Sequence, residues 1–345
     1  MTTRTTHPSR GAGPLRPGAA RPAFALLLAL LLLAAATLAS IALGSLAIPP
    51  GALWDVLTGH GDPHHTAVVH SRYPRTALGI LAGACLAVAG TLMQGVTRNP
   101  LADPGMLGIN AGASATIVLA TAYLGASGQA DILWWSLPGA LAAGLLVHLI
   151  GTRRGGTSTV RLVLAGAVLA AVLNALIQAV TLSRPEVFDN YRFWVVGSLA
   201  GRGFDTLWTV LPLAAAGLLA ALALGRPLNT LALGDDSATA LGARPARTKA
   251  AGLLTATLLA AAATAATGPI AFIGLAVPHL VRALLGPDLR HQILFSLLLG
   301  PSLLLAADII GRLLLRPEEL MVGIVTAFVG APALLIAVRK MRKDA

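Results

Sequence analysis

The densest group of residues that could bind a metal consists of four histidines, His60, His64, His65 and His70. Imidazole is a common ligand of zinc and of haem iron, so the residue type alone would suit either. No cysteine accompanies the histidines, however, and their spacing does not follow one face of a helix or a strand. We therefore expect a solvated loop at this position and no metal site.

The chain lacks the motif with which ATPases bind nucleotide phosphates. It contains no G-x-x-x-x-G-K-[ST] sequence, and none of its three lysines, Lys249, Lys340 and Lys343, follows a glycine. A P-loop requires that lysine and the glycine-rich turn before it. If ATP drives this protein, a separate subunit must bind the ATP.

The ionisable residues also give no pattern of catalysis within a membrane. The sequence H-E-x-x-H is absent, and His148, His279 and Asp308 lie near the ends of apolar segments. A proton relay or an intramembrane metalloenzyme would place such groups deep inside the helix bundle. We therefore assign no catalytic residue and no cofactor to this chain.

The elements that must position the polar residues are membrane helices. Hydrophobic residues make up 56% of the 345 residues, charged residues make up only 11%, and the mean hydropathy is +0.77. A helix needs about 20 apolar residues to cross about 30 Å of hydrocarbon. Such segments lie near residues 24–44, 77–97, 106–125, 131–151, 162–183, 206–224, 250–267, 270–285, 292–311 and 321–338. The sequence therefore predicts an all-α integral membrane protein with about ten transmembrane helices.

The connections between these segments are too short for a second domain. We expect residues 1–22 to form a disordered basic cytoplasmic tail, residues 23–340 to form one transmembrane domain, and residues 341–345 to form a C-terminal cytoplasmic tail. A signal peptide is the alternative for the first apolar segment, but its length favours an uncleaved helix. The single cysteine, Cys85, excludes an intrachain disulfide and is expected to be a packing residue.

The distribution of arginine and lysine predicts the orientation of the chain. With the N-terminus in the cytoplasm, most of the 25 basic residues fall on cytoplasmic segments, as the positive-inside rule requires. Ten helices then place the C-terminus on the same side. Because topology explains the formal net charge of +11, no nucleic-acid partner is needed.

Several short sequences go beyond general membrane physics. In the first half they are Arg72-Tyr73-Pro74-Arg75, Gly83-Ala84 with Gly90 and Gln94, the polar turn from Arg98 to Ile109, and Gly112-Ala113. In the second half they are Pro227-Leu228-Asn229, Leu231-Ala232-Leu233-Gly234, Leu241-Gly242, the stretch from Gly268 to Leu275, Pro278-His279 with Arg282, Ala307-Asp308 and Gly330-Ala331-Pro332. In this combination and order, the chain resembles the permease subunits of the FecCD family. Departures are Met321, where the family usually has proline, and Leu289, where histidine is common.

The FecCD family belongs to ABC importers for ferric siderophores, haem and cobalamin. The resemblance implies a type II ABC importer permease in the bacterial cytoplasmic membrane, with two copies forming a homodimer around the transport pathway. The implied partners are two ATP-binding subunits that use ATP and magnesium, an extracytoplasmic solute-binding protein and membrane lipid. A ferric siderophore is the expected cargo, with haem or cobalamin as the alternative.

The resemblance assigns Arg72, Arg75 and Arg312 to docking of the solute-binding protein through its acidic residues. The predicted topology independently places all three arginines outside, where basic residues are unusual. Arg312 follows Asp308 by four residues, so the acid could orient the base on one helix face. The alternative is that these arginines bond to lipid phosphates.

The longest predicted cytoplasmic loop, residues 226–249, contains a short helical pattern. Its first turn could be capped by Asp235 or Asp236, and Gly242 could end it. By resemblance this helix couples the permease to the ATPase, and the residues concerned are Asp235, Asp236, Ala240, Leu241, Gly242 and Ala243. The alternative is an ordinary solvated loop helix.

By the same resemblance, Asn99 and Leu101 form a cytoplasmic gate with Thr159 and Val160. Two prolines stiffen the loop that carries Asn99 and Leu101, because each fixes its own φ angle and restricts the residue before it. We expect such a loop to move as a unit.

Asn174 and Gln178 are four residues apart and share a face of one predicted helix. They could line the transport pathway, or they could equally hydrogen-bond to a neighbouring helix.

Two other classes of protein compete with the importer. An ion-coupled secondary transporter would need broken helices with buried charges, and a membrane-embedded enzyme would need clustered catalytic groups, and the sequence predicts neither.

Overall fold

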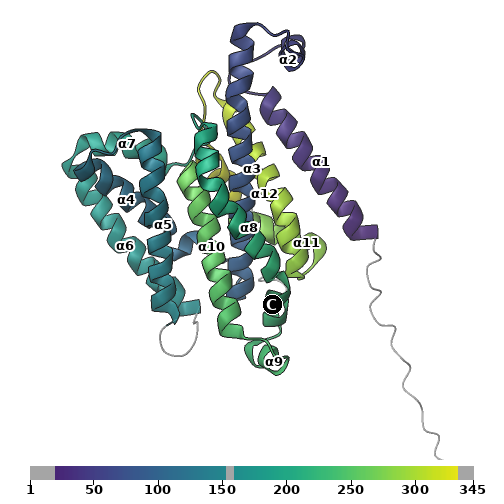
Figure 1. Cartoon of the computed structure of the whole chain (residues 1–345), viewed down its shortest axis with the longest axis vertical. Coiled ribbons are helices and arrows are strands. Elements are labelled where there is room, and N and C mark those ends of the chain that lie inside the picture. The colour runs from purple at the N-terminus through teal and green to yellow at the C-terminus, as the bar shows by residue number, and fades with distance from the viewer. Residues whose placement is uncertain (1–19, 153–158, 333–345) are drawn as a thin grey trace, which may run out of the picture.

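The computed structural model describes residues 20–152 and 159–332, and Figure 1 shows their arrangement. The helices are α1 (Ala20–Ala42), α2 (Pro50–Leu57), α3 (Pro63–Thr97), the 3₁₀ helix η1 (Pro104–Leu107), α4 (Ile109–Leu124), α5 (Gly128–Thr152), α6 (Thr159–Ser183), α7 (Pro185–Val195), α8 (Phe204–Ala232), α9 (Asp235–Ala240), α10 (Pro245–Thr267), α11 (Ile273–Leu285), α12 (Leu289–Leu314) and a last helix, Val322–Pro332. No strand occurs in these ranges. The prediction of an all-α protein is therefore confirmed.

Each apolar segment identified in the sequence overlaps one of these helices, and residues 333–338 of the last segment lie outside the described residues. Within the described ranges, seven helices are long and apolar enough to cross a membrane, and α4, α11 and the helix Val322–Pro332 are shorter apolar helices. Two of the short helices begin late because Gly108 and Phe272, the residues before them, adopt positive φ angles that a helix cannot continue through. The chain is a multi-pass membrane protein.

Two helices, α2 and α7, do not correspond to any predicted segment. Both are too short to span a membrane, and both begin with a proline, Pro50 and Pro185. Proline suits the first position of a helix because the N–H that it lacks would have no partner there. Figure 1 shows α2 and α7 toward one end of the molecule and α9 at the opposite end.

The helix α3 forms the centre of the core and packs against α8, α10, α11 and α12. Small residues allow this close packing. A Cβ atom on Gly90 would lie 1.9 Å from the carbonyl oxygen of Gly274, and one on Gly83 would lie 2.6 Å from the Cα of Pro301. Close approach of backbones is how membrane helices associate without a hydrophobic driving force between them. Cys85 is buried in this core, which agrees with its expected packing role.

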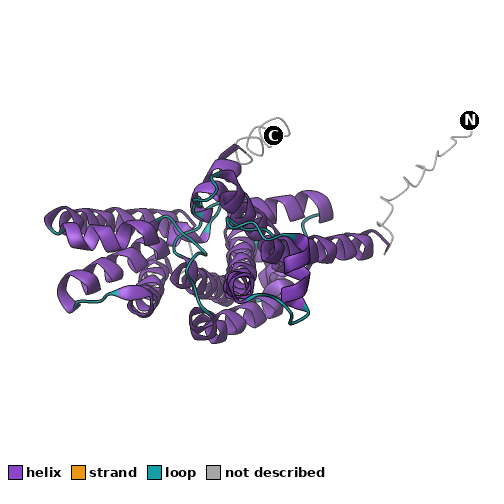
Figure 2. Cartoon of the chain, turned by 90° about the horizontal axis from the view of Figure 1, so that it is seen from above, coloured by secondary structure: helices purple, strands orange, loops and turns teal. Residues whose placement is uncertain are grey.

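Two parts of the fold flank the core on opposite sides, as the view from above shows (Figure 2). The helices α4, α5, α6 and α7 pack against one another on one side, and α1 packs against α12 on the other. Large apolar side chains are exposed on both parts, including Leu31 and Leu38 on α1 and Val168 and Val172 on α6. Lipid or another protein must cover such faces.

The predicted tails, residues 1–22 and 341–345, lie outside the described residues except where α1 begins. That helix starts at Ala20 and so enters the region expected to be disordered. The division of the chain into two tails and one domain stays a prediction.

Candidate functional site

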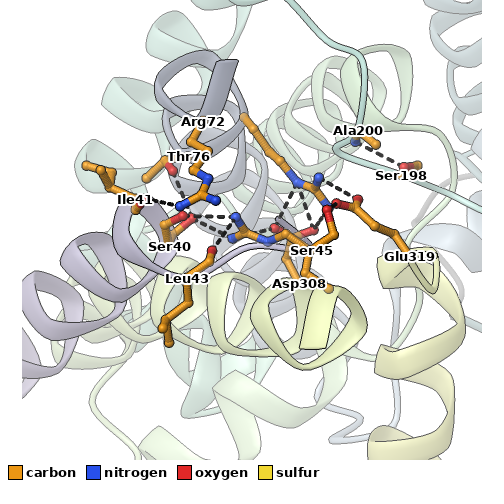
Figure 3. Close-up of polar contacts among 12 residues, drawn as sticks. Ser40, Ile41, Leu43, Ser45, Arg72, Thr76, Ser198, Ala200, Asp308 and Glu319 are labelled. Atoms are coloured by element: carbon orange, nitrogen blue, oxygen red, sulfur yellow. Dashed lines mark hydrogen bonds and ion pairs between the residues drawn. The ribbon is translucent and has the colours of Figure 1, made fainter. Parts of the chain in front are cut away.

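One end of the molecule contains a buried cluster of three arginines and two acids, part of which is labelled in Figure 3. Arg72 and Arg75 lie about one turn apart on α3, and Asp308 and Arg312 lie about one turn apart on α12. Residues at these spacings share a helix face. The packing of α3 against α12 brings the two pairs together, and the loop after α12 adds Glu319.

Asp308 is the centre of this cluster. Arg75 donates hydrogen bonds to its carboxylate from Nη2 at 2.8 Å and from Nε at 3.0 Å. The Nη2 of Arg312 lies 2.9 Å from the same carboxylate. The ion pair expected between Asp308 and Arg312 is therefore present, and the acid orients Arg75 as well.

The arginines also satisfy the C-terminal end of α1. Arg72 donates to the carbonyl oxygens of Ile41 and Ala42 at 2.8 Å, and Arg312 donates to the carbonyl oxygen of Ser40 at 2.9 Å. The last carbonyl groups of a helix have no partner within it and carry partial negative charge. Cationic donors meet both requirements, so this contact ties the end of α1 to α3 and α12.

These bonds put the predicted docking residues in the interior. The exposed fraction is 5% for Arg72 and 1% for Arg312, and the side chain of Arg75 is 12% exposed. Buried charges of this kind require hydrogen-bonded partners, which the cluster supplies within the chain. Contact of the three arginines with a binding protein stays a prediction.

Glu319 is a residue of the cluster that the sequence analysis does not identify. Its carboxylate accepts a hydrogen bond from Arg75 and another from the hydroxyl of Ser45, each at 2.7 Å. Burial opposes ionisation, but the bond to Arg75 and the charge of Arg75 outweigh it and hold the pKa of Glu319 below its usual value. Its position in the sequence could have drawn attention to it, because Glu319 lies two residues before Met321, which departs from the family pattern.

A cavity of about 420 Å³ adjoins the cluster. Arg72, Arg75 and Arg312 line it on one side together with Glu319. Arg202, in the loop between α7 and α8, lines it as well, and the sequence analysis does not single out this residue. More positively than negatively charged side chains therefore line the cavity.

At the opposite end, the short helix predicted within residues 226–249 is α9. Its N-cap is Gly234, and no side chain caps its first N–H groups, so the prediction that Asp235 or Asp236 caps the helix is wrong. Both acids instead lie in the first turn, where their charge favours the helix N-terminus. Gly242 follows the helix with a φ angle of +81°, as expected of a glycine that ends a helix.

Asp235 binds two cations instead of capping the helix. The Nη2 of Arg98 lies 2.5 Å from one carboxylate oxygen, and the Nζ of Lys249 lies 2.5 Å from the other. The hydrogen bond from Lys249 is the largest of the effects that lower the pKa of Asp235, and the bond from Arg98 adds to it. Because Lys249 belongs to α10 and Arg98 follows α3, this acid connects α9 to both.

The other residues assigned to coupling form the end of α9 and the turn after it. Ala240, Leu241 and Gly242 are exposed, and Ala243 is half-buried. Figure 1 shows this turn at the extremity of the molecule, beyond the ends of the long helices. The turn is accessible to a partner, and its contact with an ATPase stays a prediction.

The loop that carries two of the predicted gate residues has defined local structure. Arg98 adopts a left-handed conformation with a φ angle of 52° and ends α3, and the side chain of Asn99 accepts a hydrogen bond from the N–H of Leu101 at 3.0 Å. Asp103 then caps η1 by accepting from the N–H of Gly105 at 2.8 Å. Burial raises the pKa of Asp103.

The other predicted half of the gate lies at the start of α6. The side chain of Thr159 falls outside the described residues, and Val160 is 74% exposed. The close approach of α6 to the gate loop occurs further along the helix, where a Cβ atom on Gly166 would lie 1.9 Å from the carbonyl oxygen of Met106. The participation of Thr159 and Val160 in a gate stays a prediction.

Asn174 and Gln178 are both exposed on α6. Within the ranges that the structure describes, neither side chain makes a hydrogen bond, so the expected alternative of a bond to a neighbouring helix of the same chain is not observed there. A polar side chain facing lipid is unfavourable. This part of α6 is therefore better suited to a protein or a water-filled surface than to lipid.

The histidines lie mostly in a helix, so the expectation of a loop is wrong for three of them. α3 begins at Pro63 and includes His64, His65 and His70. The reason is the cap formed by Asp62, whose side chain accepts from the N–H groups of His64 and His65. In the described part of the chain, no group of three or more His, Cys, Asp or Glu residues is placed to hold a metal ion.

The described residues therefore form the helical bundle of a multi-pass membrane protein, with a buried ionic cluster at one end and a short loop helix at the other. The chain belongs to the FecCD transport family, whose profile matches residues 31–340. This membership confirms the resemblance found in the sequence.

Individual relatives agree with this assignment. The chain is 53% identical over 277 residues to the ferric enterobactin transport system permease protein FepD of Escherichia coli (strain K12), covering 80% of this chain and 82% of that protein. It is 36% identical over 312 residues to the hemin transport system permease protein HmuU of Yersinia pestis, covering 85% and 88%. Among solved structures, a metal-chelate type ABC transporter in an inward-facing conformation superposes with a TM-score of 0.81 at 27% identity, covering 92% of this chain and 99% of that chain.

Proposed function

We propose that this chain is the transmembrane permease subunit of an ATP-driven ABC importer that moves a ferric siderophore into the bacterial cytoplasm. The observation that carries this proposal is the 53% identity to a ferric enterobactin permease. Because the sequence contains no P-loop, two separate ATP-binding subunits bind the ATP and magnesium and hydrolyse the ATP. The chain itself needs no cofactor.

The end with the arginine cluster faces the outside of the cytoplasmic membrane, and α9 faces the cytoplasm together with both chain termini. The distribution of basic residues supports this orientation. A solute-binding protein docks on the outer end, at the surface that Arg72, Arg75 and Arg312 support. Because Arg72 and Arg312 bond to α1, their role includes holding this surface in shape.

On the inner side, α9 and the turn after it dock in a cleft of the ATP-binding subunit, through Asp235, Asp236, Ala240, Leu241, Gly242 and Ala243. Movement of this helix reaches the gate residues Asn99 and Leu101 because Asp235 is bonded to Arg98, the residue directly before Asn99. The ion pair supports coupling between ATP hydrolysis and gate opening.

Two copies of the chain form a homodimer with the transport pathway on its two-fold axis. The exposed polar residues Asn174 and Gln178 support the assignment of this part of α6 to the pathway, since they have no hydrogen-bond partner in the described part of their own chain. Thr159 and Val160, at the start of the same helix, then complete the cytoplasmic gate with Asn99 and Leu101.

The first experiment identifies the partners and the cargo. The permease is purified from its native membrane with its associated proteins, and the captured solute-binding protein is tested by fluorescence quenching with a ferric siderophore, haem and cobalamin. Submicromolar binding of the siderophore supports the proposal, whereas tight binding of haem or cobalamin keeps the mechanism and changes the cargo.

The same preparation tests the class of transporter. If neither an ATP-binding subunit nor a binding protein is recovered, and liposomes containing the chain alone take up ferric siderophore under an ion gradient, the protein is a secondary transporter and the importer proposal is wrong. Uptake that requires ATP and both partners supports the importer.

A further inference from the structure

The cavity at the outer end contains a buried arginine that lacks a partner in the described part of the chain. Arg202 is only 9% exposed, and its Nε has no hydrogen-bond partner there. Within the described residues, Arg202 forms no ion pair, and burial alone lowers the pKa of this guanidinium. The ordinary pKa of arginine is so high that the group still carries its charge at neutral pH.

The other arginines of the cavity differ from Arg202 because each already binds carboxylate or carbonyl oxygens, although the Nε of Arg312 also has no partner among the described residues. Arg75 and Arg312 share the carboxylate of Asp308, and Arg75 also binds Glu319. Arg72 donates to three carbonyl oxygens, the third being that of Leu46 at 2.7 Å. Four guanidinium groups therefore meet two carboxylates, and within the described ranges Arg202 is the one of the four that binds neither a carboxylate nor a carbonyl oxygen.

An unpaired charge in the interior destabilises the fold, because the free energy lost by removing water from it is offset only by a partner of opposite charge. The loop around Arg202 leaves space for such a partner. Gly201 and Gly203 flank Arg202 and both line the cavity, and Gly201 has a φ angle of +69°, which favours glycine. No side chain from these two neighbours fills the space in front of the guanidinium.

We propose that this cavity binds a carboxylate side chain of the docked solute-binding protein, and that Arg202 is its principal donor. The inference rests on the proposed function and adds a fourth arginine to the docking surface. In this arrangement Arg72, Arg75 and Arg312 hold the walls of the cavity, and Arg202 makes the new bond. The planar guanidinium can donate two parallel hydrogen bonds to one carboxylate.

The position of the cavity favours a protein over a lipid as the source of the anion. Loop residues form much of its border, with Gly44, Ser45 and Leu46 after α1 and Gly201 and Gly203 before α8. These loops lie at the ends of helices and not along the apolar sides of the bundle, which face the hydrocarbon. A protein that docks on the end of the bundle can insert a side chain there.

The test compares two arginine substitutions in the intact transporter reconstituted in nanodiscs. Binding of the solute-binding protein recovered with the native complex is measured by biolayer interferometry. Arg202→Gln should weaken binding at least about 10-fold, as expected for loss of a charge-assisted hydrogen bond. The loss should appear mainly as faster dissociation, because the substitution removes a buried charge pair. Long-range electrostatic steering, which sets the association rate, should change little.

Arg192→Gln is the matched control. Arg192 also lies on the outer end, on α7, but its side chain is 50% exposed and pairs with Asp189. This substitution should leave the affinity unchanged within about 2-fold, as expected for an exposed ion pair. Arg202→Lys, which keeps the charge without the planar fork, should recover part of the affinity.

Thermal unfolding of the free permease separates docking from folding. Arg202→Gln removes an unpaired buried charge, so its unfolding temperature should be equal to or higher than that of the wild type. Unchanged affinity of a folded Arg202→Gln variant overturns the inference while the importer proposal stands. If the wild-type transporter does not bind the binding protein at all, the importer proposal fails together with the inference.

Native mass spectrometry distinguishes a lipid phosphate from a protein carboxylate. If Arg202→Gln loses a bound phosphatidylglycerol and keeps its affinity for the binding protein, the anion is a lipid headgroup and the inference is wrong. Retention of the same lipids together with weaker protein binding supports the carboxylate of the partner.

Discussion

The guanidinium of Arg98 lies 2.5 Å from the carboxylate of Asp235, so an ion pair joins the loop after α3 to the short helix α9. The same guanidinium donates to the carbonyl oxygen of Leu231 at 2.6 Å, near the end of α8. Three segments that are distant in the sequence therefore meet at one side chain. A displacement of α9 would pull directly on the loop that carries Asn99 and Leu101.

Replacement of Arg98 by alanine should uncouple ATP hydrolysis from transport. We expect ATP hydrolysis to continue in the assembled complex. Uptake of ferric siderophore should fall by about 5-fold or more, which corresponds to a typical coupling free energy between two sites. Both rates are measured in proteoliposomes. Arg247→Ala, at an exposed position of α10, is the control, and equal uptake by Arg98→Ala and this control would contradict the prediction.

Glu319 should make the outer cluster sensitive to acid. Its pKa in the folded protein is below its ordinary value of 4.5, so the ionised form stabilises the fold above that value, and this contribution is lost as the pH falls below it. The stabilisation by Glu319 is fully present between pH 6 and about pH 8 and should not change with pH in that range. Glu319→Gln should therefore unfold about 2–4 °C lower at pH 7 and should show a smaller further loss below pH 4.5.

The matching control for the pH series is Glu186→Gln, because Glu186 is exposed on α7. Its unfolding temperature should follow that of the wild type from pH 7 down to about pH 3.5. A Glu319→Gln variant that loses as much stability as the wild type on acidification would show that another group is responsible.

The contact between Gly90 and Gly274 should not tolerate a methyl group. A Cβ atom on Gly90 would lie 1.9 Å from the carbonyl oxygen of Gly274, and only a shift of two packed backbones could relieve this overlap. We expect Gly90→Ala to cost more than about 3 kcal/mol, seen as low yield of folded protein by size-exclusion chromatography.

Gly51→Ala is the control for this substitution. No atom lies within 4 Å of a Cβ atom built on Gly51, although this residue is also helical. Its effect on stability should be within about 1 kcal/mol, and alanine can even be favourable at such a position. Equal yields of the two variants would show that α3 and α11 can separate without cost.

A cysteine at Gln178 should cross-link two copies of the chain. Cys85 is the single native cysteine, so a Cys85→Ala background removes every other thiol. If α6 lines a pathway between two copies, Gln178→Cys should form a covalent dimer with a thiol oxidant in native membranes. Leu219→Cys, on the exposed face of α8, should stay monomeric on a denaturing gel, and cross-linking at Leu219 alone would exclude the proposed dimer interface.

The helices were predictable because they depend on local properties of the chain. A run of about 20 apolar residues is required wherever a helix crosses hydrocarbon, and the sequence of each of the seven long helices in the described ranges contains such a run. The pair Asp308 and Arg312 was predictable for the same reason, since a spacing of four residues places both on one helix face. Gly242 was recognised as the end of α9 from its type alone.

The contacts of single side chains were less predictable. Asp235 was expected to cap α9, but two cations from other segments bind it, one of them Arg98, which is 137 positions away. Glu319 was missed because Arg75, which determines its environment, is 244 positions away. Arg202 was missed because an arginine in a loop is ordinarily exposed, and its burial depends on the packing of loops around it.

The sequence by itself therefore determined the membrane class, the places of the long apolar helices, the family and the residues that carry charge. Only the tertiary structure decided which acceptor each guanidinium finds. The physical reason is that helix length and turn chemistry depend on neighbours along the chain, whereas a buried charge is stabilised by whatever polar group the packing of distant helices brings within hydrogen-bond distance. Arg72 and Arg312 illustrate this difference, since their charge was evident from the sequence but their bonds to carbonyl groups at the end of α1 were not.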